Sequence, residues 1–281
     1  MKPTVSVVIP AHDEAGVIAA NLDTLLTGTG PGEFDVIVVA NACTDGTARA
    51  AARPGVRVLE TSRAGKVEAL RLGDDACRAF PRVYLDADVR LDAKSVRALA
   101  EAASRPGVLA CAPVPEWDLA GTGRVVRRVH RVHDRLIAPS RALAGVGVYV
   151  LTEEGHRRVF PLPDVISDDG YVDGSFTGDE RVVVTEARSV VRPARTVRAH
   201  LARRVRVRQG NRQLAGLGRP GRSLRAGALR DLLAAREVSA LDAACYLTVL
   251  AADRALTLLR GGKTAWGTDT GTRSGRPPAT P

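Results

Sequence analysis

Two aspartates, Asp86 and Asp88, follow the apolar run at residues 83–85 in the sequence VYLDADVRL. Such a run is typical of a buried strand that ends at a crevice. Because residues i and i+2 of a strand point to the same side, we expect both carboxylates to face one divalent cation or the groups around it. Carboxylate oxygens suit Mg²⁺ or Mn²⁺, and such a cation suits a diphosphate. The alternative is a turn in which one Asp caps the next helix.

The stretch before these acids alternates apolar runs with amphipathic segments, which predicts strands and helices in turn. The expected elements are strands at residues 5–9, 36–39, 56–59 and 83–85, with helices at 15–26, 47–53 and 66–77 between them. This order predicts an α/β fold with a doubly wound, mostly parallel sheet. Ligands of such sheets bind beyond the carboxyl ends of the strands. We therefore expect the polar clusters found there to line one cleft; they are residues 12–14, 41–47, 61–66 and 86–88.

The composition bounds the class of protein. With 281 residues, of which 45% are hydrophobic and 26% charged, the chain can form one sizeable globular core, alone or with an appended element. Its four cysteines include no Cys-x-x-Cys pair, so their spacing indicates neither a zinc site nor a disulfide framework. The apolar run at residues 5–9 is too short for a signal peptide, and the longest apolar runs are about half of the roughly 20 residues that a spanning helix needs. We therefore expect no transmembrane segment and a cytoplasmic location.

The net charge of +10 is unevenly distributed. Residues 1–180 contain 21 Lys and Arg against 25 Asp and Glu, whereas residues 181–281 contain 20 against 6, which gives net charges of −4 and +14. A basic segment can bind nucleic acid, an anionic membrane surface or a phosphorylated ligand. Nucleic-acid binding would be favoured by aromatic residues among the arginines, and none occurs between Arg181 and Arg236. We therefore expect no nucleic-acid partner.

Four motifs carry a resemblance to a known family. The chain has neither a Gly-x-Gly-x-x-Gly after its first strand nor a Walker Gly-Lys-Ser/Thr, so a nucleotide would be held by carboxylates, amides and a metal. The runs VSVVIPAHDE, VIVVANACTDGT, RAGKVEAL and VYLDADV, in this order, resemble the nucleotide-sugar domain of GT-A glycosyltransferases, specifically glycosyltransferase family 2, over residues 4–210. The resemblance implies a GT-A fold. It also implies metal-dependent, inverting transfer of a sugar from a nucleotide sugar, with a UDP-sugar as the first choice, to a hydroxyl-bearing acceptor.

The resemblance assigns the donor nucleotide to residues at the ends of the first three strands. Pro10, Ala11 and Glu14 match the segment that lines the base and ribose pocket in the family. Asn41 stands where the family often has an Asp that contacts the base, and Lys66 matches a basic position near the nucleotide. Two of these residues have simpler interpretations. Lys66 could be the solvated start of a helix, and Glu14 a carboxylate at a helix N-terminus, where the helix dipole favours it.

The resemblance assigns the metal and the chemistry to two acidic pairs. Asp86 and Asp88 match the family's metal-binding DxD motif, which implies Mg²⁺ or Mn²⁺. In the sequence SDDG at residues 167–170, Asp169 matches the second acid of a pair, which serves as the general base in this family. Sugar transfer needs such a base near the acceptor hydroxyl and positive charge near the leaving diphosphate. From the residues alone, Asp168 or Asp169 could equally cap a helix.

An arginine-rich run at residues 203–211 is the candidate for binding the diphosphate. Processive family members often have Gln-x-x-Arg-Trp here, and the matching positions are Arg203, Arg206 and Val207, so only the Arg is kept. This departure favours transfer of a single sugar over polymer synthesis. Arg204 and Arg206 are the candidates for the phosphate oxygens, because guanidinium groups bind them through paired hydrogen bonds. The alternative is a solvated charged face. His200, just upstream, is a further candidate for the metal.

The remaining elements are predicted from periodicity and capping. We expect a helix at residues 93–104, strands at 108–112 and 145–151, and a helix N-cap at Thr152. A C-terminal helix at residues 239–259 is expected to begin with Ser239 as N-cap and Asp242 as its capping partner. Its expected apolar stripe is Leu241, Cys245, Val249, Ala252 and Leu256. We expect this stripe to pack on the core, with peripheral contact to the inner membrane face as the alternative.

These observations predict a domain plan and three functions to distinguish. Residues 1–210 would form the GT-A domain, with a nucleotide-sugar half at 1–92 and an acceptor half at 93–210. A basic loop and helices would follow at 211–260, and a disordered tail at 261–281. The acceptor would be a small molecule, a lipid-linked molecule or a glycan. The alternatives to a glycosyltransferase are a sugar-phosphate nucleotidyltransferase and a non-catalytic protein that binds polyanions or membranes through residues 192–236.

Overall fold

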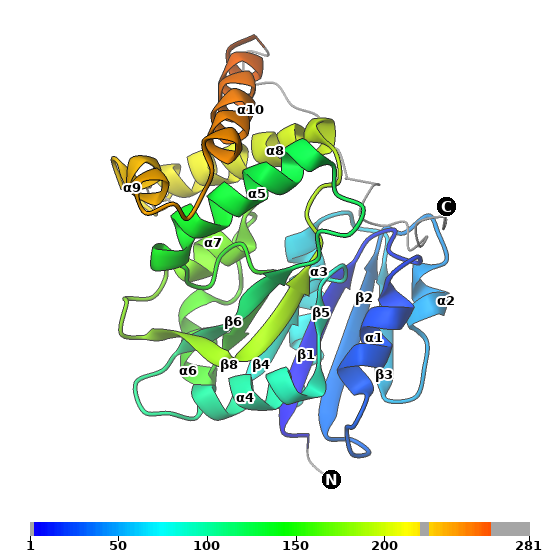
Figure 1. The fold of residues 1–281 in the computed structure, drawn as a ribbon. Coiled ribbons are helices and arrows are strands. Elements are labelled where there is room, and N and C mark those ends of the chain that lie inside the picture. The colour runs from blue at the N-terminus through cyan, green and yellow to red at the C-terminus, as the bar shows by residue number, and fades with distance from the viewer. Residues whose placement is uncertain (1–2, 220–224, 260–281) are drawn as a thin grey trace. The chain divides into compact units, whose positions relative to one another are not determined.

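Within residues 3–219 and 225–259, which the computed structural model describes, eight strands form one mixed sheet (Figure 1). Its order is β3-β2-β1-β4-β7-β6-β8-β5. The strands are β1 (Val5–Ala11), β2 (Phe34–Asn41), β3 (Val56–Thr61), β4 (Arg82–Leu85), β5 (Arg90–Leu91), β6 (Ala110–Trp117), β7 (Val148–Leu151) and β8 (Arg181–Val191). The pairs β1–β2, β1–β4, β2–β3 and β6–β8 are parallel, whereas β4–β7, β6–β7 and β5–β8 are antiparallel. The predicted α/β fold with a mostly parallel sheet is confirmed.

Helices cover both faces of this sheet, because its strands direct apolar side chains to both sides. Val5, Val7 and Ile9 of β1 share one core with α1 and α4. On the opposite face, a β-carbon at Gly73 of α3 would lie 2.5 Å from Val8, so the glycine lets α3 approach β1 closely. The helices of the part of the chain that holds the sheet are α1 (Ile18–Leu26), α2 (Thr47–Ala51), α3 (Lys66–Asp75), α4 (Ala93–Ala103), α6 (Glu153–Val159) and α7 (Asp168–Asp173). The elements predicted for residues 5–85 are all present, with ends shifted by at most three residues.

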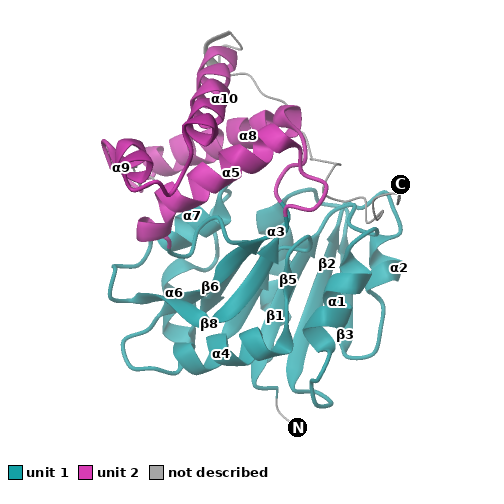
Figure 2. Cartoon of the chain, viewed as in Figure 1, with its two compact units in different colours: residues 1–118, 142–192, 273–275 teal, residues 119–141, 193–272, 276–281 magenta. Residues whose placement is uncertain are grey.

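The chain divides into two compact units (Figure 2). Of the described residues, unit 1 comprises 3–118 and 142–192 and holds the sheet, and unit 2 comprises 119–141 and 193–259. Residue 210, the expected end of the GT-A domain, lies within α8 (Val197–Gly216) of unit 2, and the division into a GT-A domain and an extension stays a prediction. The tail expected at residues 261–281 lies outside the described residues.

Unit 2 consists of helices around a core of its own. The other helices of this unit are α5 (Arg124–Ile137), the 3₁₀ helix η1 (Ala138–Ser140), α9 (Ala228–Ala234) and α10 (Ala240–Leu259). The core consists of Val129, Val132, Leu136, Val238, Tyr246 and Val249. The predicted capping pair is confirmed, because Ser239 N donates to Asp242 Oδ2 at 3.2 Å and Asp242 N donates to Ser239 Oγ at 3.1 Å. Among the described helices, none is long and apolar enough to cross a membrane.

The buried face of α10 differs from the predicted stripe. Val249 is buried as expected, but Leu241 is 56% exposed, and Ala243 and Tyr246 lie in the interior instead. Two acids on the same face explain the rotation, because Asp242 and Asp253 are both buried and pair with arginines. These ion pairs are Asp242 with Arg128 and Arg131 of α5, and Asp253 with Arg204 and Arg208 of α8. Charge pairing, as well as apolar contact, therefore fixes how α10 packs in unit 2.

Candidate active site

Three separate elements of unit 1 meet at the ammonium group of Lys66. Lys66 begins α3, and its Nζ lies 2.7 Å from Oδ1 of Asp86, which follows β4. The same Nζ lies 2.9 Å from Oδ1 of Asp168, which begins α7. The fold therefore brings together a predicted metal ligand, a predicted nucleotide-binding lysine and the acidic pair at residues 168–169.

The loop before Lys66 is fixed by Asn41 at the end of β2. Asn41 Oδ1 accepts a hydrogen bond from Gly65 N at 2.9 Å, and its Nδ2 donates to the carbonyl oxygen of Arg63. Gly65 has a φ of +148°, a conformation that side chains with a β-carbon rarely adopt. Asn41 therefore positions the start of α3, and with it the ammonium of Lys66. A contact from Asn41 to the nucleotide base stays a prediction.

Asp86 and Asp88 lie in a turn rather than on a strand. β4 ends at Leu85, and Val89 N donates to the carbonyl oxygen of Asp86 at 3.0 Å, which closes the turn. The expectation that strand alternation places both carboxylates on one side therefore does not apply. Asp86 N donates to the carbonyl oxygen of Gly147 at 2.9 Å, and a β-carbon at Gly147 would lie 2.5 Å from Val89. The turn is held against the chain that leads into β7, and both acids are half-buried.

Asp169 is a carboxylate with hydrogen bonds to both oxygens. Its Oδ2 accepts from Gly145 N at 2.7 Å, and its Oδ1 accepts from Ser167 Oγ and Gly170 N, both at 2.7 Å. Burial by itself would raise the pKa of Asp169, but Lys66 and these hydrogen bonds outweigh it and hold the pKa below its usual value. The group is therefore ionised at neutral pH, which is the form that a general base needs.

Asp168 differs from its neighbour in burial and in partners. It is 2% exposed, and burial raises its pKa to about 6 although Lys66 acts in the opposite direction. Within the described residues its Oδ2 has no hydrogen-bond partner. The N-cap of α7 is Ser167, whose Oγ accepts from Gly170 N at 3.3 Å, so neither aspartate caps this helix. A buried carboxylate with one unsatisfied oxygen is suited to bind a further cation or donor.

Tyr149 is a candidate that the sequence did not indicate. Its hydroxyl, on β7, is buried and has no hydrogen-bond partner among the described residues. Its ring stacks on Tyr84, with centroids 4.8 Å apart. Burial, then the charges of Asp168, Asp169 and Asp86, raise the pKa of the hydroxyl well above its usual value, so it stays a donor. No local motif marks Tyr149, because it lies in an apolar strand whose neighbours are known only from the fold.

The predicted base and ribose segment lies at the end of β1. Ala11 and Glu14 are buried, and Pro10 is half-buried. The backbone N–H of Glu14 donates to Thr47 Oγ1 at 2.7 Å, which joins the chain after β1 to the start of α2. The carbonyl oxygen of Glu14 accepts from the N–H of Ile18, the first residue of α1. Glu14 therefore lies at the N-terminus of α1, and its role at the nucleotide stays a prediction.

The predicted arginines and histidine belong to unit 2. Arg204 Nε lies 2.9 Å from Asp253 Oδ2, and Arg206 is half-buried on the same helix. His200 is buried, and burial, then Arg204, lowers the pKa of His200 to about 4. The imidazole is therefore neutral at pH 7. Binding of a diphosphate by Arg204 and Arg206, and of a metal by His200, stays a prediction.

Comparison with known proteins adds a family and a fold. Residues 6–144 match the family model Glycosyl transferase family 2. No curated protein matches the chain. The mannosyltransferase PcManGT from Pyrobaculum calidifontis, solved in complex with GDP-Man and Mn²⁺, is 22% identical, with 92% of this chain and 76% of that chain covered and a TM-score of 0.61.

A second solved structure has the same fold. Glucosyl-3-phosphoglycerate synthase from Mycobacterium tuberculosis, in complex with Mn²⁺, UDP and glucosyl-3-phosphoglycerate, is 23% identical. The match covers 78% of this chain and 81% of that chain, with a TM-score of 0.55. Likeness at these identities shows the fold, and the family model shows the membership. Through residues 6–144 the chain belongs to glycosyltransferase family 2, and it is a glycosyltransferase of the GT-A fold.

Proposed function

We propose that this glycosyltransferase moves a single sugar from a nucleotide sugar to a hydroxyl-bearing acceptor, with inversion at the sugar C1 and with Mg²⁺ or Mn²⁺ as cofactor. The observation that supports the proposal most is the convergence of Lys66, Asp86 and Asp168 beside the ionised carboxylate of Asp169. This arrangement supplies a base and positive charge within one site, as the reaction requires.

The residues present fit a hard divalent cation. The site already gathers two carboxylates around one positive charge, the ammonium of Lys66, and Asp168 Oδ2 has no partner among the described residues. We propose that Asp86 and Asp88 hold the cation through carboxylate oxygens, the ligands that Mg²⁺ and Mn²⁺ prefer. When bound, the cation would neutralise negative charge on the diphosphate of the donor.

Asp169 can accept the proton of the acceptor hydroxyl. A carboxylate oxygen has two lone-pair sites, and among the described residues Asp169 Oδ2 uses one for the N–H of Gly145. The second is open to the acceptor O–H. As this proton moves to Asp169, the acceptor oxygen forms a bond to C1, and the bond from C1 to the diphosphate oxygen breaks with its electron pair on the leaving group. Attack from the face opposite the diphosphate inverts C1. Lys66 would place an ammonium near the departing charge.

The donor and the acceptor are defined here by class. A UDP-sugar is our first choice of donor, and Pro10, Ala11, Glu14 and Asn41 are the proposed contacts to its base and ribose. The absence of the Gln and Trp at the processive motif favours transfer of one sugar. The acceptor is a small molecule, a lipid-linked molecule or a glycan. We also propose a cytoplasmic protein, with peripheral contact to the inner membrane face as an alternative state.

A ligand panel tests the proposal. A ligand that binds only the folded state raises the melting temperature, so nucleotides and nucleotide sugars should be screened with and without Mn²⁺. We expect one base to stabilise the protein only when Mn²⁺ is present, and turnover of its sugar donor to release a nucleoside diphosphate. Release of pyrophosphate would instead indicate a nucleotidyltransferase. Salt-sensitive binding to anionic vesicles, without any nucleotide effect, would indicate the non-catalytic alternative.

A further inference from the structure

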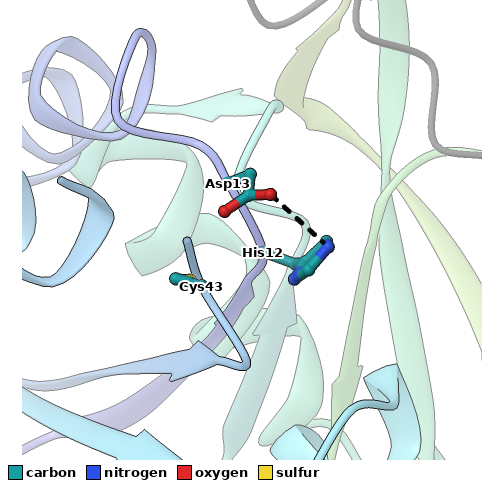
Figure 3. A group of neighbouring side chains, drawn as sticks. All are labelled: His12, Asp13 and Cys43. Atoms are coloured by element: carbon teal, nitrogen blue, oxygen red, sulfur yellow. Dashed lines mark ion pairs between the residues drawn. The ribbon is translucent and has the colours of Figure 1, made fainter. Parts of the chain in front are cut away.

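Three side chains of the types that bind transition metals lie together where β1 and β2 end (Figure 3). His12 and Asp13 follow β1, and Cys43 follows β2. One ligand atom from each lies within 4.8 Å of the other two, and all three residues are partly exposed. Among the described residues no other group of three or more His, Cys, Asp or Glu is this close. A cation could therefore reach this group from solvent.

The imidazole of His12 is oriented as in a metal-binding histidine. Its Nδ1 lies 2.8 Å from the carbonyl oxygen of Asn41, which can only accept, so Nδ1 carries a proton and donates. In the neutral ring Nε2 then has the lone pair, and it lies 3.7 Å from Asp13 Oδ2. Metal-bound histidines typically donate their other ring N–H to a backbone carbonyl or a carboxylate in this way. Nε2 of His12 and Oδ2 of Asp13 are therefore two electron-rich atoms that face each other, and a cation or a proton between them would stabilise this arrangement.

The loops that carry these side chains are held in unfavourable backbone conformations. Asp13 has a φ of +52° and Ala42, next to Cys43, has a φ of +45°, and these are two of the three non-glycine residues with positive φ in the described chain. Thr44 fixes Asp13, because its backbone N–H donates to Asp13 Oδ1 at 2.7 Å. The Thr44 hydroxyl also lies 3.3 Å from Asp13 Oδ1 and 3.2 Å from Asp13 Oδ2, so Thr44 holds the whole carboxylate in place. Non-glycine residues persist in such conformations where the surroundings impose them, which is frequent at functional sites.

The spacing fits tetrahedral zinc after one small movement. Bonds of about 2.1 Å from Zn²⁺ to N and O place those two ligands about 3.4 Å apart at the tetrahedral angle, near the 3.7 Å between His12 and Asp13. A bond of about 2.3 Å to sulfur requires the Cys43 Sγ to move inward by roughly 1 Å. We propose that rotation about χ1 of Cys43 brings about this movement. It gives up a weak hydrogen bond from the thiol to the carbonyl oxygen of Ala11, at 3.4 Å.

We propose that His12, Asp13 and Cys43 form a zinc site, with water as the remaining ligand. On binding, the Cys43 thiol releases its proton to solvent and a thiolate–zinc bond forms. An imidazole, a thiolate and a carboxylate favour Zn²⁺ over Mg²⁺ and Mn²⁺, so the site is distinct from the cation proposed at Asp86 and Asp88. Cysteine spacing did not indicate this zinc site, because its ligands lie in the segments that follow two different strands. The site does not depend on the proposed sugar transfer.

Cobalt spectroscopy on the full chain tests the proposal. Co²⁺ takes tetrahedral zinc sites and reports a bound thiolate by a near-ultraviolet charge-transfer band. We expect this band to saturate at one equivalent of Co²⁺, to be abolished by added Zn²⁺, and to be unaffected by the same concentration of Mg²⁺. No thiolate band, or a band that Mg²⁺ removes, would overturn the proposal.

Variants identify the ligands. Cys43→Ser should abolish the band, and His12→Ala and Asp13→Asn should each weaken Co²⁺ and Zn²⁺ binding by more than about 10-fold, since even outer-shell partners are worth about 10–100-fold. Cys77→Ser and Cys245→Ser are the matched controls and should keep the band. Circular dichroism at 25 °C verifies that each variant is folded. Loss of the band in a control, or its retention in folded Cys43→Ser, would show that the site lies elsewhere.

Discussion

Two groups of buried ionisable side chains, one in each unit, differ in how they are charged. In unit 1, the ammonium of Lys66 lies between the carboxylates of Asp86 and Asp168, so opposite charges face each other. In unit 2, the rings of His130 and His200 pack edge to face with centroids 5.4 Å apart. Burial, then the neighbouring imidazole of His200, lowers the pKa of His130 to about 3, and burial, then Arg204, lowers that of His200 to about 4. At neutral pH the first group is charged and the second is neutral.

The difference follows from the cost of burying charge. A buried group keeps its charge when a counter-ion offsets the lost hydration. A buried histidine stays neutral when burial and cationic neighbours both disfavour its protonated form. The group in unit 1 contains both signs of charge, so its carboxylates can exchange the ammonium of Lys66 for a metal, or the ammonium can bind an anionic diphosphate. A group of neutral imidazoles contributes packing. We therefore expect the general base and Lys66 of unit 1 to act in the reaction, and the neutral histidines of unit 2 to contribute to stability.

Asp169→Asn should have the largest effect. The amide keeps the shape of the side chain but has no ionised oxygen to take the acceptor proton, so turnover should fall by about 10²–10⁴-fold while donor affinity changes little. Steady-state rates and nucleotide-sugar titration measure the two separately. Asp164→Asn is the matched control, because Asp164 precedes α7 by a few residues and its side chain is 88% exposed. Equal activity of the Asp169 and Asp164 variants would contradict the assignment.

Lys66→Met should leave the carboxylates of Asp86 and Asp168 without the ammonium that lies between them. The free energy of unfolding should fall by about 1–3 kcal/mol, less than for a fully buried ion pair because Lys66 is 36% exposed. Mn²⁺ should raise the melting temperature of this variant more than that of the wild type, because the metal replaces the lost charge. Lys94→Met, at an exposed lysine of α4, is the control and should do neither. An unchanged melting temperature together with no gain from Mn²⁺ would count against the role of Lys66.

Acid should loosen the histidine group of unit 2. The pKa of His200 is about 4 in the folded chain and about 6.5 in the unfolded one, so below pH 6.5 the unfolded chain binds more protons. Stability is therefore full above pH 6.5 and is lost as the pH falls toward 4. We expect a loss of about 1–2 kcal/mol between pH 7 and pH 5 from His200.

Urea unfolding of the wild type and of His200→Asn at both pH values isolates the contribution of His200 to the free energy of unfolding. Acids such as Asp168 titrate in both proteins, so their effect cancels in the comparison. The variant should be less stable than the wild type at pH 7 and should lose less on acidification. Parallel pH dependence in the two proteins would mean that His200 is not the group responsible.

The smallest expected effects come from two serine caps. Ser239→Ala removes the cap of α10, and Ser167→Ala removes that of α7, each at a cost of about 1 kcal/mol. Ser167 also donates to Asp169, so its loss should lower turnover as well. Ser239 should affect the melting temperature alone. Equal losses of activity in the two variants would contradict a specific effect of Ser167 on Asp169.

The elements of the N-terminal half of the fold, and the proximity of Lys66 to Asp86, were predictable from sequence. Strand and helix periodicity is local, and the carboxyl ends of parallel strands meet at one edge, so Lys66 and Asp86 could be expected to be neighbours. β8 was missed, although residues 181–191 contain five valines, a strand signal. The ion pair between Lys66 and Asp168 has no local signal, because 101 residues separate the partners along the chain.

Other features depend on geometry that only the fold supplies. The strand alternation expected for Asp86 and Asp88 fails because β4 ends at Leu85 and both acids lie in the turn that follows it. The buried face of α10 is rotated because Asp242 and Asp253 pair with arginines of other helices. Tyr149 enters the site from an apolar strand and has no motif. Each of these depends on partners that are distant in sequence.

The most direct test is a crystal structure with Mn²⁺ and the nucleoside diphosphate selected by the ligand panel. The anomalous signal of manganese locates the cation independently of the nucleotide. We expect it bound to carboxylate oxygens of Asp86 or Asp88 and to the diphosphate, with Asp169 open to the acceptor side. A manganese peak away from both aspartates, with Lys66 still bridging Asp86 and Asp168, would contradict the proposed site.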